Sequence, residues 1–298
     1  MRTLLFLAAF FCYYTVATHS KLLAKTDSST IHLQSDINST LKATDQIRES
    51  FGKYSIESPE LYDGNHQDFE HIQIIEDRKL GSAFVFYIHR DLDGDRDKVW
   101  PKGLERQRNE IKGYQSSSPV LKAKLGEVSR YQWNLKIDPS FSLTHNFCHF
   151  FQLKPVGTGK ESDPVLTLSG SIHRGKPQLE ICWWTKGKTE RLHIADWNTA
   201  KGKWLICECK SHFSPHGTLH FSLRSLDNKI NFKHEMDPFN SWRTSYSFVR
   251  PKWGIYRSLI NRNSIINEED KVFMDNFFIQ KWSDLPGKIK STNKELPQ

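Results

Sequence analysis

Hydrophobic and polar residues alternate in short runs through residues 51–282, and Gly, Pro, Asn and Asp separate these runs. Such alternation is typical of β-strands, in which successive side chains point to opposite faces of a sheet. Because no helical period lies between the runs, we expect neighbouring strands to pair antiparallel. The pattern predicts one all-β domain, an antiparallel two-sheet sandwich or β-jelly roll. The predicted strands span residues 82–89, 108–114, 130–137, 147–156, 165–172, 178–184, 203–210, 218–225, 229–235, 252–257 and 271–282.

The two ends of the chain differ from this domain. Residues 1–20 contain an early Arg2, an apolar run and then small residues, which is the layout of a secretory signal peptide. The apolar run is too short for a membrane anchor, so we expect a secreted, extracellular protein. Residues 21–50 are rich in Ser, Thr, Asp and Lys, which predicts a flexible polar leader with an exposed glycosylation sequon at Asn38. Residues 283–298 are predicted to form a polar tail.

Composition supports a sheet protein with an anionic partner. The chain has 19 Phe, 9 Trp and 9 Tyr but only 3 Met, a balance that fits pleated sheets better than helical bundles or coiled coils. Its 42 Lys and Arg exceed its 34 Asp and Glu, which gives a net charge of +8. This surplus attracts polyanions such as acidic polysaccharides, nucleic acids or membrane headgroups.

Four cysteines remain after removal of the predicted signal peptide. An even number in an exported chain predicts two disulfides. Cys207 and Cys209 point the same way on one strand, at a separation near the upper limit for bridging, so each is expected to pair with Cys148 or Cys182. The alternative is four buried free thiols. A zinc site on these cysteines is not indicated, because no Cys-x-x-Cys spacing is present.

Three predicted strands carry an unusual polar face. Their apolar faces suit the core between two sheets, whereas their opposite faces combine Arg, Lys, Gln, Tyr and Glu with one Gly. This composition predicts a cationic hydrogen-bonding surface, and the alternative is ordinary solvent-exposed strand residues. The polar faces consist of Arg108, Glu110 and Lys112; Phe150, Gln152 and Lys154; and Lys252, Gly254 and Tyr256.

These strands resemble, in the same order, three strand motifs of the jelly-roll polysaccharide lyases, the alginate lyase, glucuronan lyase and heparin lyase I groups. The motifs here read Arg-Asn-Glu-Ile-Lys at 108–112, Gln-Leu-Lys at 152–154 and Lys-Trp-Gly-Ile-Tyr-Arg at 252–257, and the run 274–279 is similar to the closing strand of those enzymes. The resemblance covers about residues 51–282. It implies a concave groove that binds an acidic sugar chain, with Arg108, Glu110, Lys112, Lys252, Arg257 and His145 as substrate-binding candidates.

Cleavage of a uronic acid polymer by β-elimination requires three chemical roles. The uronate carboxylate must be neutralised, a base must remove the proton on C5, and an acid must protonate the departing O4. Arg108, Gln152 and Lys154 are candidates for neutralising the carboxylate. Tyr256 is the candidate for base and acid, with a pKa lowered by the neighbouring cations Lys252 and Arg257. The alternative for Tyr256 is a groove residue that only stacks on sugar.

The sequence departs from the alginate lyase pattern at one important place. That pattern usually reads Gln-x-His, whereas this chain has Lys154 at the third position. His149 would face the core in an unbroken strand, but a β-bulge could turn it into the groove, and His145 could reach the groove from the preceding loop. Lys154 could be the base if its pKa were depressed. For each histidine, a structural role in a loop or in the core is the alternative.

An acidic segment precedes the first of these strands. Asp91, Asp93 and Asp95 carry carboxylates at alternate positions, a spacing that can wrap calcium. The segment is not an EF-hand, because Arg96 and Lys102 occupy the positions that require Gly and Glu. The alternatives are an exposed acidic loop and a plain contact between an aspartate and Arg106. β-Elimination of this kind requires no cofactor, so calcium is an optional ion here.

Together these features predict a secreted, monomeric polysaccharide lyase whose partner is an acidic polysaccharide. Aromatic residues among Lys and Arg also occur in single-stranded nucleic-acid binders, but the secretory signal argues against nucleic acid as the partner. No membrane partner is expected. The other alternative is a secreted lectin-like module that binds acidic glycans without cleaving them. The missing histidine of the Gln-x-His pattern favours this alternative, and Tyr256 beside Lys252 favours an enzyme.

Overall fold

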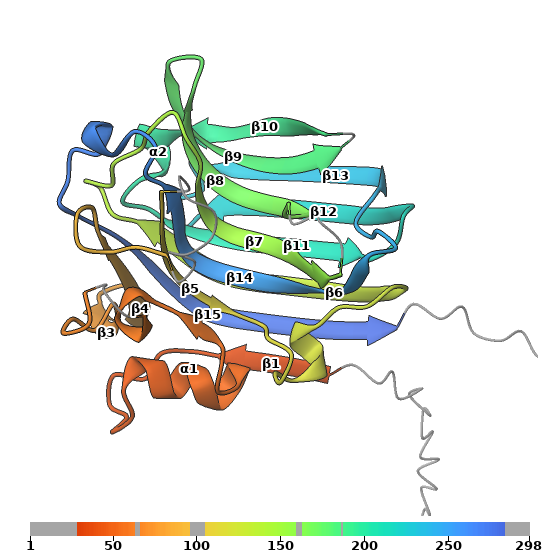
Figure 1. Cartoon of the computed structure of the whole chain (residues 1–298), viewed down its shortest axis with the longest axis horizontal. Helices are drawn as coiled ribbons and strands as arrows, with labels where there is room; N and C mark the ends of the chain where they lie inside the picture. Colours follow the sequence, from red (N-terminus) through yellow and green to blue (C-terminus); the bar gives the residue numbers. More distant parts are fainter. Residues whose placement is uncertain (1–28, 63–65, 96–104, 159–162, 186, 284–298) are drawn as a thin grey trace, which may run out of the picture.

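A computed structural model describes residues 29–62, 66–95, 105–158, 163–185 and 187–283. In this part of the chain, two antiparallel sheets pack face to face around one hydrophobic core (Figure 1). Sheet A has the order β13-β12-β11-β6-β15-β4-β3, with β1 also paired along β15, and sheet B has the order β10-β9-β8-β7-β14-β5-β2. The predicted all-β, two-sheet antiparallel fold is therefore confirmed.

Strands account for most of the described chain. The strands of sheet A are β1 (Ser29–Leu33), β3 (Ile72–Asp77), β4 (Gly81–His89), β6 (Glu127–Ile137), β11 (Trp204–His212), β12 (Gly217–Ser225), β13 (Asn231–Phe239) and β15 (Glu269–Ser283). Those of sheet B are β2 (Ile56–Glu57), β5 (Arg106–Lys112), β7 (Cys148–Gly157), β8 (Leu166–His173), β9 (Lys176–Thr185), β10 (Lys188–Asp196) and β14 (Tyr246–Ser258). The helices are α1 (Ala43–Phe51) and α2 (Trp197–Ala200), with short 3-10 turns at Pro59–Leu61, Pro119–Leu121 and Arg262–Ser264.

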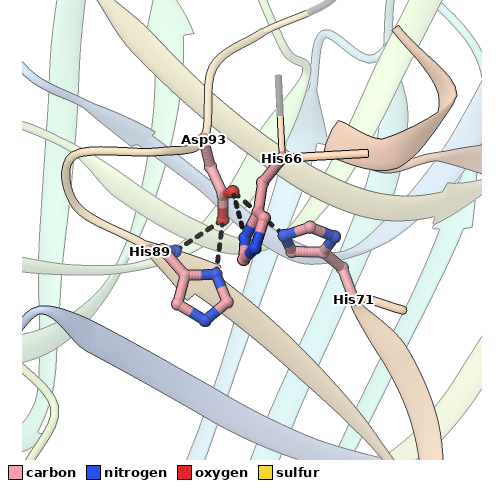
Figure 2. Close-up of side chains that lie close together, drawn as sticks. All are labelled: His66, His71, His89 and Asp93. Carbon is pink, nitrogen blue, oxygen red and sulfur yellow. Dashed lines mark hydrogen bonds and ion pairs between the residues drawn. The ribbon is translucent and has the colours of Figure 1, made fainter. Parts of the chain in front are cut away.

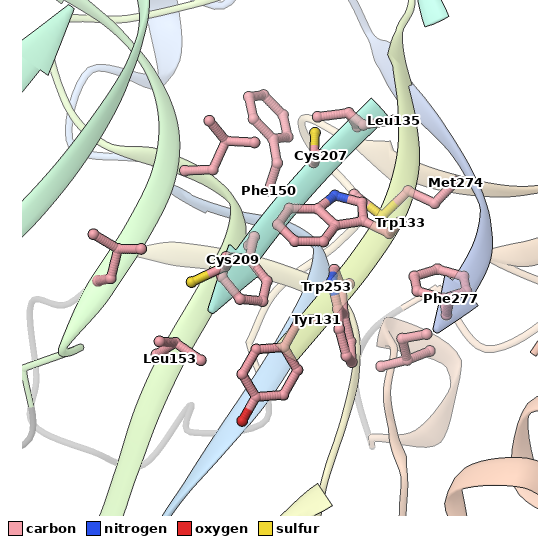
Figure 3. Close-up of a cluster of buried hydrophobic side chains, with 14 of the residues drawn as sticks. Tyr131, Trp133, Leu135, Phe150, Leu153, Cys207, Cys209, Trp253, Met274 and Phe277 are labelled. Carbon is pink, nitrogen blue, oxygen red and sulfur yellow. The ribbon is translucent and has the colours of Figure 1, made fainter. Parts of the chain in front are cut away.

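Aromatic side chains from both sheets fill the core. Trp133 of β6 stacks on Phe151 of β7, with ring centroids 4.4 Å apart. Trp253 of β14 packs on Phe277 of β15 at 5.3 Å (Figure 3). Large rings bury more apolar area than aliphatic side chains, so these contacts hold the two sheets together. They also fix which face of β7 and β14 is turned away from the core.

The structure contradicts the predicted flexible leader for residues 29–50. Strand β1 pairs with β15, and helix α1 packs on the core (Figure 1). Ala43, Ile47 and Phe51 recur every four residues and so form one apolar helix face. The ring centroid of Phe51 lies 5.7 Å from that of Trp253. The apolar residues are few, but their helical spacing lets them bury a face. The predicted signal peptide, at residues 1–20, and the tail after Ser283 lie outside the described residues.

The predicted disulfides are also contradicted, and the alternative of four free thiols is confirmed. Cys148 and Cys182 belong to sheet B, whereas Cys207 and Cys209 belong to sheet A and lie in the core (Figure 3). Packed sheets are about 10 Å apart, farther than the Cα separation that a disulfide spans. Burial raises the pKa of Cys182 to about 12, so its thiol stays protonated.

Among the described residues, no helix combines the length and the apolar character that crossing a membrane requires. Helix α1, for example, has nine residues.

Candidate functional site

The three strands with predicted polar faces are neighbours in sheet B, in the order β7-β14-β5. Lys252 of β14 lies opposite Lys112 on one side and opposite Gln152 on the other, and Tyr256 lies opposite Arg108. The three strands with polar faces are therefore adjacent in the fold, as the resemblance implied. Distant parts of the chain form one polar surface on the face of sheet B that is turned away from the core.

Gly254 allows β14 and β5 to approach closely. Its φ of +133° is one that side-chain-bearing residues rarely adopt, and a Cβ atom at this position would lie 2.1 Å from the carbonyl oxygen of Asn109. The pairing of β14 with β7 shifts register in the same place, between Trp253 and Tyr256. Glycine is therefore required where the strand bends ahead of the tyrosine.

The charged side chains beneath this surface neutralise one another. Glu57 of β2 and Glu110 of β5 are both buried, and Lys252 forms ion pairs with each of them. Lys112 pairs with Glu57 at 2.5 Å, and Arg108 lies 3.2 Å from Glu57 and 3.1 Å from Glu110. Buried charges are stable in such an arrangement only when they are paired and hydrogen-bonded.

This network changes the roles predicted for four residues. Arg108, Glu110, Lys112 and Lys252 are at most 8% exposed and bind one another, so they form the support of the site and not an open cationic surface. Arg257 is likewise buried, where its guanidinium binds Gln107 and Asp270. This pairing could not be predicted from the sequence, because Glu57 belongs to a two-residue strand with no alternation of its own.

A pocket of about 410 Å³ opens above this support. It brings together five of the predicted site residues: His145, His149, Gln152, Lys154 and Tyr256. Other polar, charged and aromatic lining residues include Arg106, Asp163, Ser169, Glu180, Trp184 and Arg191.

A β-bulge places His149 in the pocket, as the sequence analysis suggested. The pairing of β7 with β8 shifts register between His149 and Phe151, and both Phe150 and Phe151 enter the core. Phe150 therefore does not lie on the polar face predicted for it. The Nδ1 atom of His149 lies 2.8 Å from the hydroxyl oxygen of Ser169, which orients the ring. Burial and the nearby cations, Lys154 first among them, lower the pKa of His149 to about 3. The imidazole is thus neutral at neutral pH.

Lys154 has the pKa that a general base needs near neutral pH. Burial disfavours its charged form, and repulsion from Lys252 and Arg108 acts in the same direction. Together they lower its pKa to about 7, although Asp163 and Glu110 oppose the shift. A substantial fraction of the amine is therefore uncharged at pH 7, which the sequence analysis named as the condition for a base at this position.

Tyr256 lies over the arginines of β5. The Arg106 guanidinium donates a hydrogen bond to the Tyr256 hydroxyl, and the Arg108 guanidinium lies 4.0 Å from the ring centroid. Burial raises the pKa of Tyr256 and outweighs the opposite effect of Arg108 and Arg106. The expected lowering by Lys252 and Arg257 is therefore not found. A protonated phenol beside two arginines is suited to donate a proton, because they stabilise the phenolate that remains.

The three carboxylates of the acidic segment point to different partners. Asp91 pairs with Arg90, Asp93 binds histidines, and Asp95 forms a two-point contact with the Arg108 guanidinium at 2.9 and 3.0 Å. An aspartate–arginine contact is thus present, but at Arg108 and not at Arg106 as expected. Each of the three carboxylates is thus engaged by a different partner.

No family model and no curated protein sequence matches this chain. Solved structures with a similar fold include three alginate lyases. Alginate lyase Aly36B in complex with an alginate trisaccharide has a TM-score of 0.52 at 10% identity, over 84% of this chain and 97% of that one. A marine alginate lyase from Aplysia kurodai has a TM-score of 0.50 at 12% identity, over 84% and 98%. The exolytic alginate lyase AlyA5 from Zobellia galactanivorans has a TM-score of 0.50 at 10% identity, over 83% and 99%.

The chain has the jelly-roll fold of these alginate lyases. Within this lyase-like fold, the sequence analysis missed two arginines of the pocket. Arg106 lies two residues before Arg108, on the same strand face, and would have been found had the strand been extended by two residues. Arg191 comes from β10, an edge strand with mostly exposed residues and too little apolar alternation to be recognised.

Proposed function

We propose that this protein is a secreted polysaccharide lyase that cleaves an acidic, uronic-acid-containing polysaccharide by β-elimination. One observation carries the proposal: Lys154, Tyr256 and two arginines line the same pocket of a lyase-like fold. Burial lowers the pKa of Lys154 to about 7 and raises the pKa of Tyr256, so part of the amine is uncharged and the phenol is protonated near neutral pH. These groups match the base, the acid and the carboxylate-binding donors that the reaction needs. Acidic polysaccharide is thus the proposed partner, and residues 1–20 are the proposed export signal.

Lys154 is the proposed base. Its uncharged Nζ atom takes the proton from C5 of the uronate and becomes an ammonium group. The electron pair of the broken C–H bond forms the double bond between C4 and C5, and the bond from C4 to O4 breaks. The proton on Lys154 then returns to solvent, so the step needs no oxidant and no cofactor.

Tyr256 is the proposed acid. Its hydroxyl gives a proton to the departing O4, which leaves a phenolate next to Arg106 and Arg108. Both guanidinium groups are in place before the reaction, so the developing negative charge meets preorganised positive charge. Proton transfer from solvent then restores the phenol.

Arg106 and Arg191 are the proposed partners of the uronate carboxylate, together with the Gln152 amide. Neutralising that carboxylate makes the C5 proton more acidic, because the intermediate carries the negative charge into the carboxylate. Glu110 accepts a hydrogen bond from Gln152 Nε2 at 2.6 Å and so holds the amide in the pocket wall. His149 completes this wall as a neutral hydrogen-bonding group.

The rival function is a lectin-like module that holds an acidic glycan without cleaving it. The raised pKa of Tyr256 favours this rival, because a protonated phenol cannot act as the base that removes the C5 proton. To separate the two functions, the mature protein should be incubated with glucuronan, alginate and heparin while the ultraviolet absorbance of the unsaturated product is followed. We expect a steady rise with at least one polymer. Binding of all three without any rise would reject the lyase and leave the lectin.

A variant of Tyr256 tests the acid. In Tyr256→Phe only the hydroxyl is lost, so we expect turnover to fall at least 100-fold, within the range typical of general acid–base groups, while polymer binding persists. Tyr54→Phe is the matched control, because Tyr54 is 55% exposed and lies outside the pocket. Turnover is measured with the same absorbance assay, and binding by affinity electrophoresis in polymer-containing gels. Equal turnover in the two variants would remove Tyr256 from the mechanism.

A further inference from the structure

A second cluster of polar side chains lies outside the pocket. His66, His71, His89 and Asp93 each offer one atom, and these four atoms all lie within 4.8 Å of one another. None of the four residues lines the 410 Å³ pocket. Figure 2 shows the three imidazole rings around the carboxylate of Asp93. The cluster joins the start of β3, the end of β4 and the segments on either side of them.

The donor atoms are arranged around a common point. His71 Nε2 lies 2.9 Å from Asp93 Oδ1, and His89 Nδ1 lies 3.2 Å from Asp93 Oδ2. His66 Nδ1 lies 3.7 Å from Asp93 Oδ1, too far for a hydrogen bond, and this buried nitrogen has no hydrogen-bond partner. A buried nitrogen without a partner is costly, and a bound cation would satisfy it.

Three imidazole nitrogens and one carboxylate oxygen form a typical set of zinc ligands. Zinc bonds of about 2.0–2.1 Å in a tetrahedron place the ligand atoms roughly 3.3 Å apart. The spacings from His71 and His66 to Asp93 Oδ1, 2.9 and 3.7 Å, lie on either side of that value, and His89 lies 3.2 Å from Oδ2 of the same carboxylate. Calcium and magnesium prefer sets made entirely of oxygen ligands, so the three nitrogens favour a transition metal.

The surroundings also suit a metal. Glu60 Oε2 lies 2.7 Å from His71 Nδ1, and Glu269 Oε2 lies 3.4 Å from His89 Nε2. Carboxylates on the far nitrogen of a ligating histidine fix the ring and raise its basicity. The Phe69 ring packs against all three imidazoles, with centroid distances of 5.3, 5.0 and 4.7 Å. This ring shields the cluster on an apolar side.

We propose that His66, His71, His89 and Asp93 form a closed tetrahedral Zn²⁺ site with a structural role. With four protein ligands no position stays open for substrate, which is the arrangement of structural zinc and not of catalytic zinc. The site would tie the segment that contains His66 to β4 and to the segment after it. The segment after β4 also carries Asp95, which binds Arg108. The metal would therefore stabilise one border of the polar support beneath Tyr256.

Metal binding to the mature full-length chain, produced without a histidine tag, tests this site. After removal of metals with a chelator, titration with ZnCl₂ is followed by calorimetry, and Co²⁺ is added in a parallel sample to record its visible spectrum. We expect one equivalent of Zn²⁺ to bind, a higher melting temperature on binding, and the intense visible bands of tetrahedral Co²⁺. Absence of stoichiometric Zn²⁺ binding, or a weak octahedral Co²⁺ spectrum, would overturn the proposal.

Two variants locate the site. His66→Gln removes a ligand whose side chain is 22% exposed, and we expect Zn²⁺ affinity to fall at least tenfold with loss of the melting-temperature increase. His193→Gln is the matched control, because His193 also lies near an aspartate, Asp196, but on the edge strand β10. Equal Zn²⁺ affinity in both variants would overturn the assignment. If His66→Gln fails to fold, the Zn²⁺ and Co²⁺ titrations of the unmodified protein decide whether the site exists. Neither experiment depends on lyase activity, so the two proposals can fail independently.

Discussion

At the scale of single residues, burial decides which side chains can take part in proton transfer. Lys154, His149 and Tyr256 line one pocket, and burial is the largest influence on all three pKa values. For the two nitrogen bases it favours the uncharged form, and for the phenol it favours the protonated form. Sequence neighbours alone suggested a lowered tyrosine pKa, because the depth of the ring cannot be read from adjacent cations.

The pH dependence of cleavage tests the role of Lys154. Its folded pKa is lowered to about 7 from 10.5, so the active, uncharged amine accumulates as the pH rises through about 7. We expect kcat/KM to increase about tenfold per pH unit below that value and to level off above it. His149, with a pKa of about 3, would leave activity flat across this range if it were the base. Initial rates between pH 5 and pH 9 (roughly the span over which the profile is defined) measure this dependence.

A substitution of Lys154 tests whether this residue causes the inflection near pH 7 in the rate profile. Lys154→Arg keeps the positive charge but not the titration, since arginine stays protonated. We expect the rate to fall by a factor of about 100 or more above pH 7, where Lys154 is mostly uncharged, and the inflection near pH 7 to disappear. Lys176→Arg is the control, because Lys176 lies on β9 with an exposed side chain outside the pocket. An inflection near pH 7 that survives in Lys154→Arg would assign the base to another group.

At the scale of elements, the eleven predicted runs all coincide with strands, whereas β1, β2, β3 and β10 were not predicted. The recognised strands have apolar residues at alternate positions, which is a local property. The strands that were not predicted lack this alternation. Strand β2 has only two residues, and β10 is an edge strand with mostly exposed side chains, so both form by pairing with a neighbouring strand. The same distinction explains the site. The alternation identified three polar strand faces, and the resemblance implied that they share one groove. Neither could supply Glu57 or Arg191, which come from missed strands.

The bulges show a second limit of sequence patterns. Strict alternation would place Phe150 on the polar face beside Gln152, and it would place His149 in the core. The register shift reverses both placements. A bulge inserts one residue without any change in composition, so only the requirement to bury both Phe150 and Phe151 signals it.

A glycine substitution tests whether the close approach of β14 and β5 is needed. In Gly254→Ala the new Cβ would meet the Asn109 backbone at 2.1 Å, and backbone atoms inside a sheet cannot move aside. We expect a loss of more than about 3 kcal/mol in the free energy of unfolding, measured by urea denaturation. Gly81→Ala is the matched control, since Gly81 also has a positive φ, of +84°, but has nothing within 4 Å of its Cβ position. There the backbone conformation alone would cost about 1 kcal/mol. Similar losses in the two variants would mean that the close approach is not what requires glycine.

At the scale of the whole molecule, the net charge of +8 is not concentrated beneath the pocket. Arg108, Lys112 and Lys252 are balanced there by Glu57, Glu110 and Asp95. Attraction of a polyanion therefore depends on cations nearer the solvent. Arg106 at the pocket is one candidate, and Arg191, which also pairs with the buried Glu180, is another. The buried network instead gives the sheet a rigid polar base, whose cost of desolvation is offset by its many ion pairs.

A second hollow, of about 1000 Å³, adjoins the pocket, and Trp184 lines both. A polymer that enters the pocket can continue across Trp184 between β9 and the end of β13, so the proposed lyase should bind several sugars at once. Trp184→Ala removes the surface on which a sugar ring can stack. For long polymer we expect KM to rise about tenfold, the equivalent of about 1.4 kcal/mol, with little change in kcat. For a substrate too short to reach the second hollow we expect a smaller effect. Trp282→Ala, on sheet A, is the control. Kinetics on polymer and on its shortest cleavable oligosaccharide measure the difference, and equal effects on both would confine binding to the first pocket.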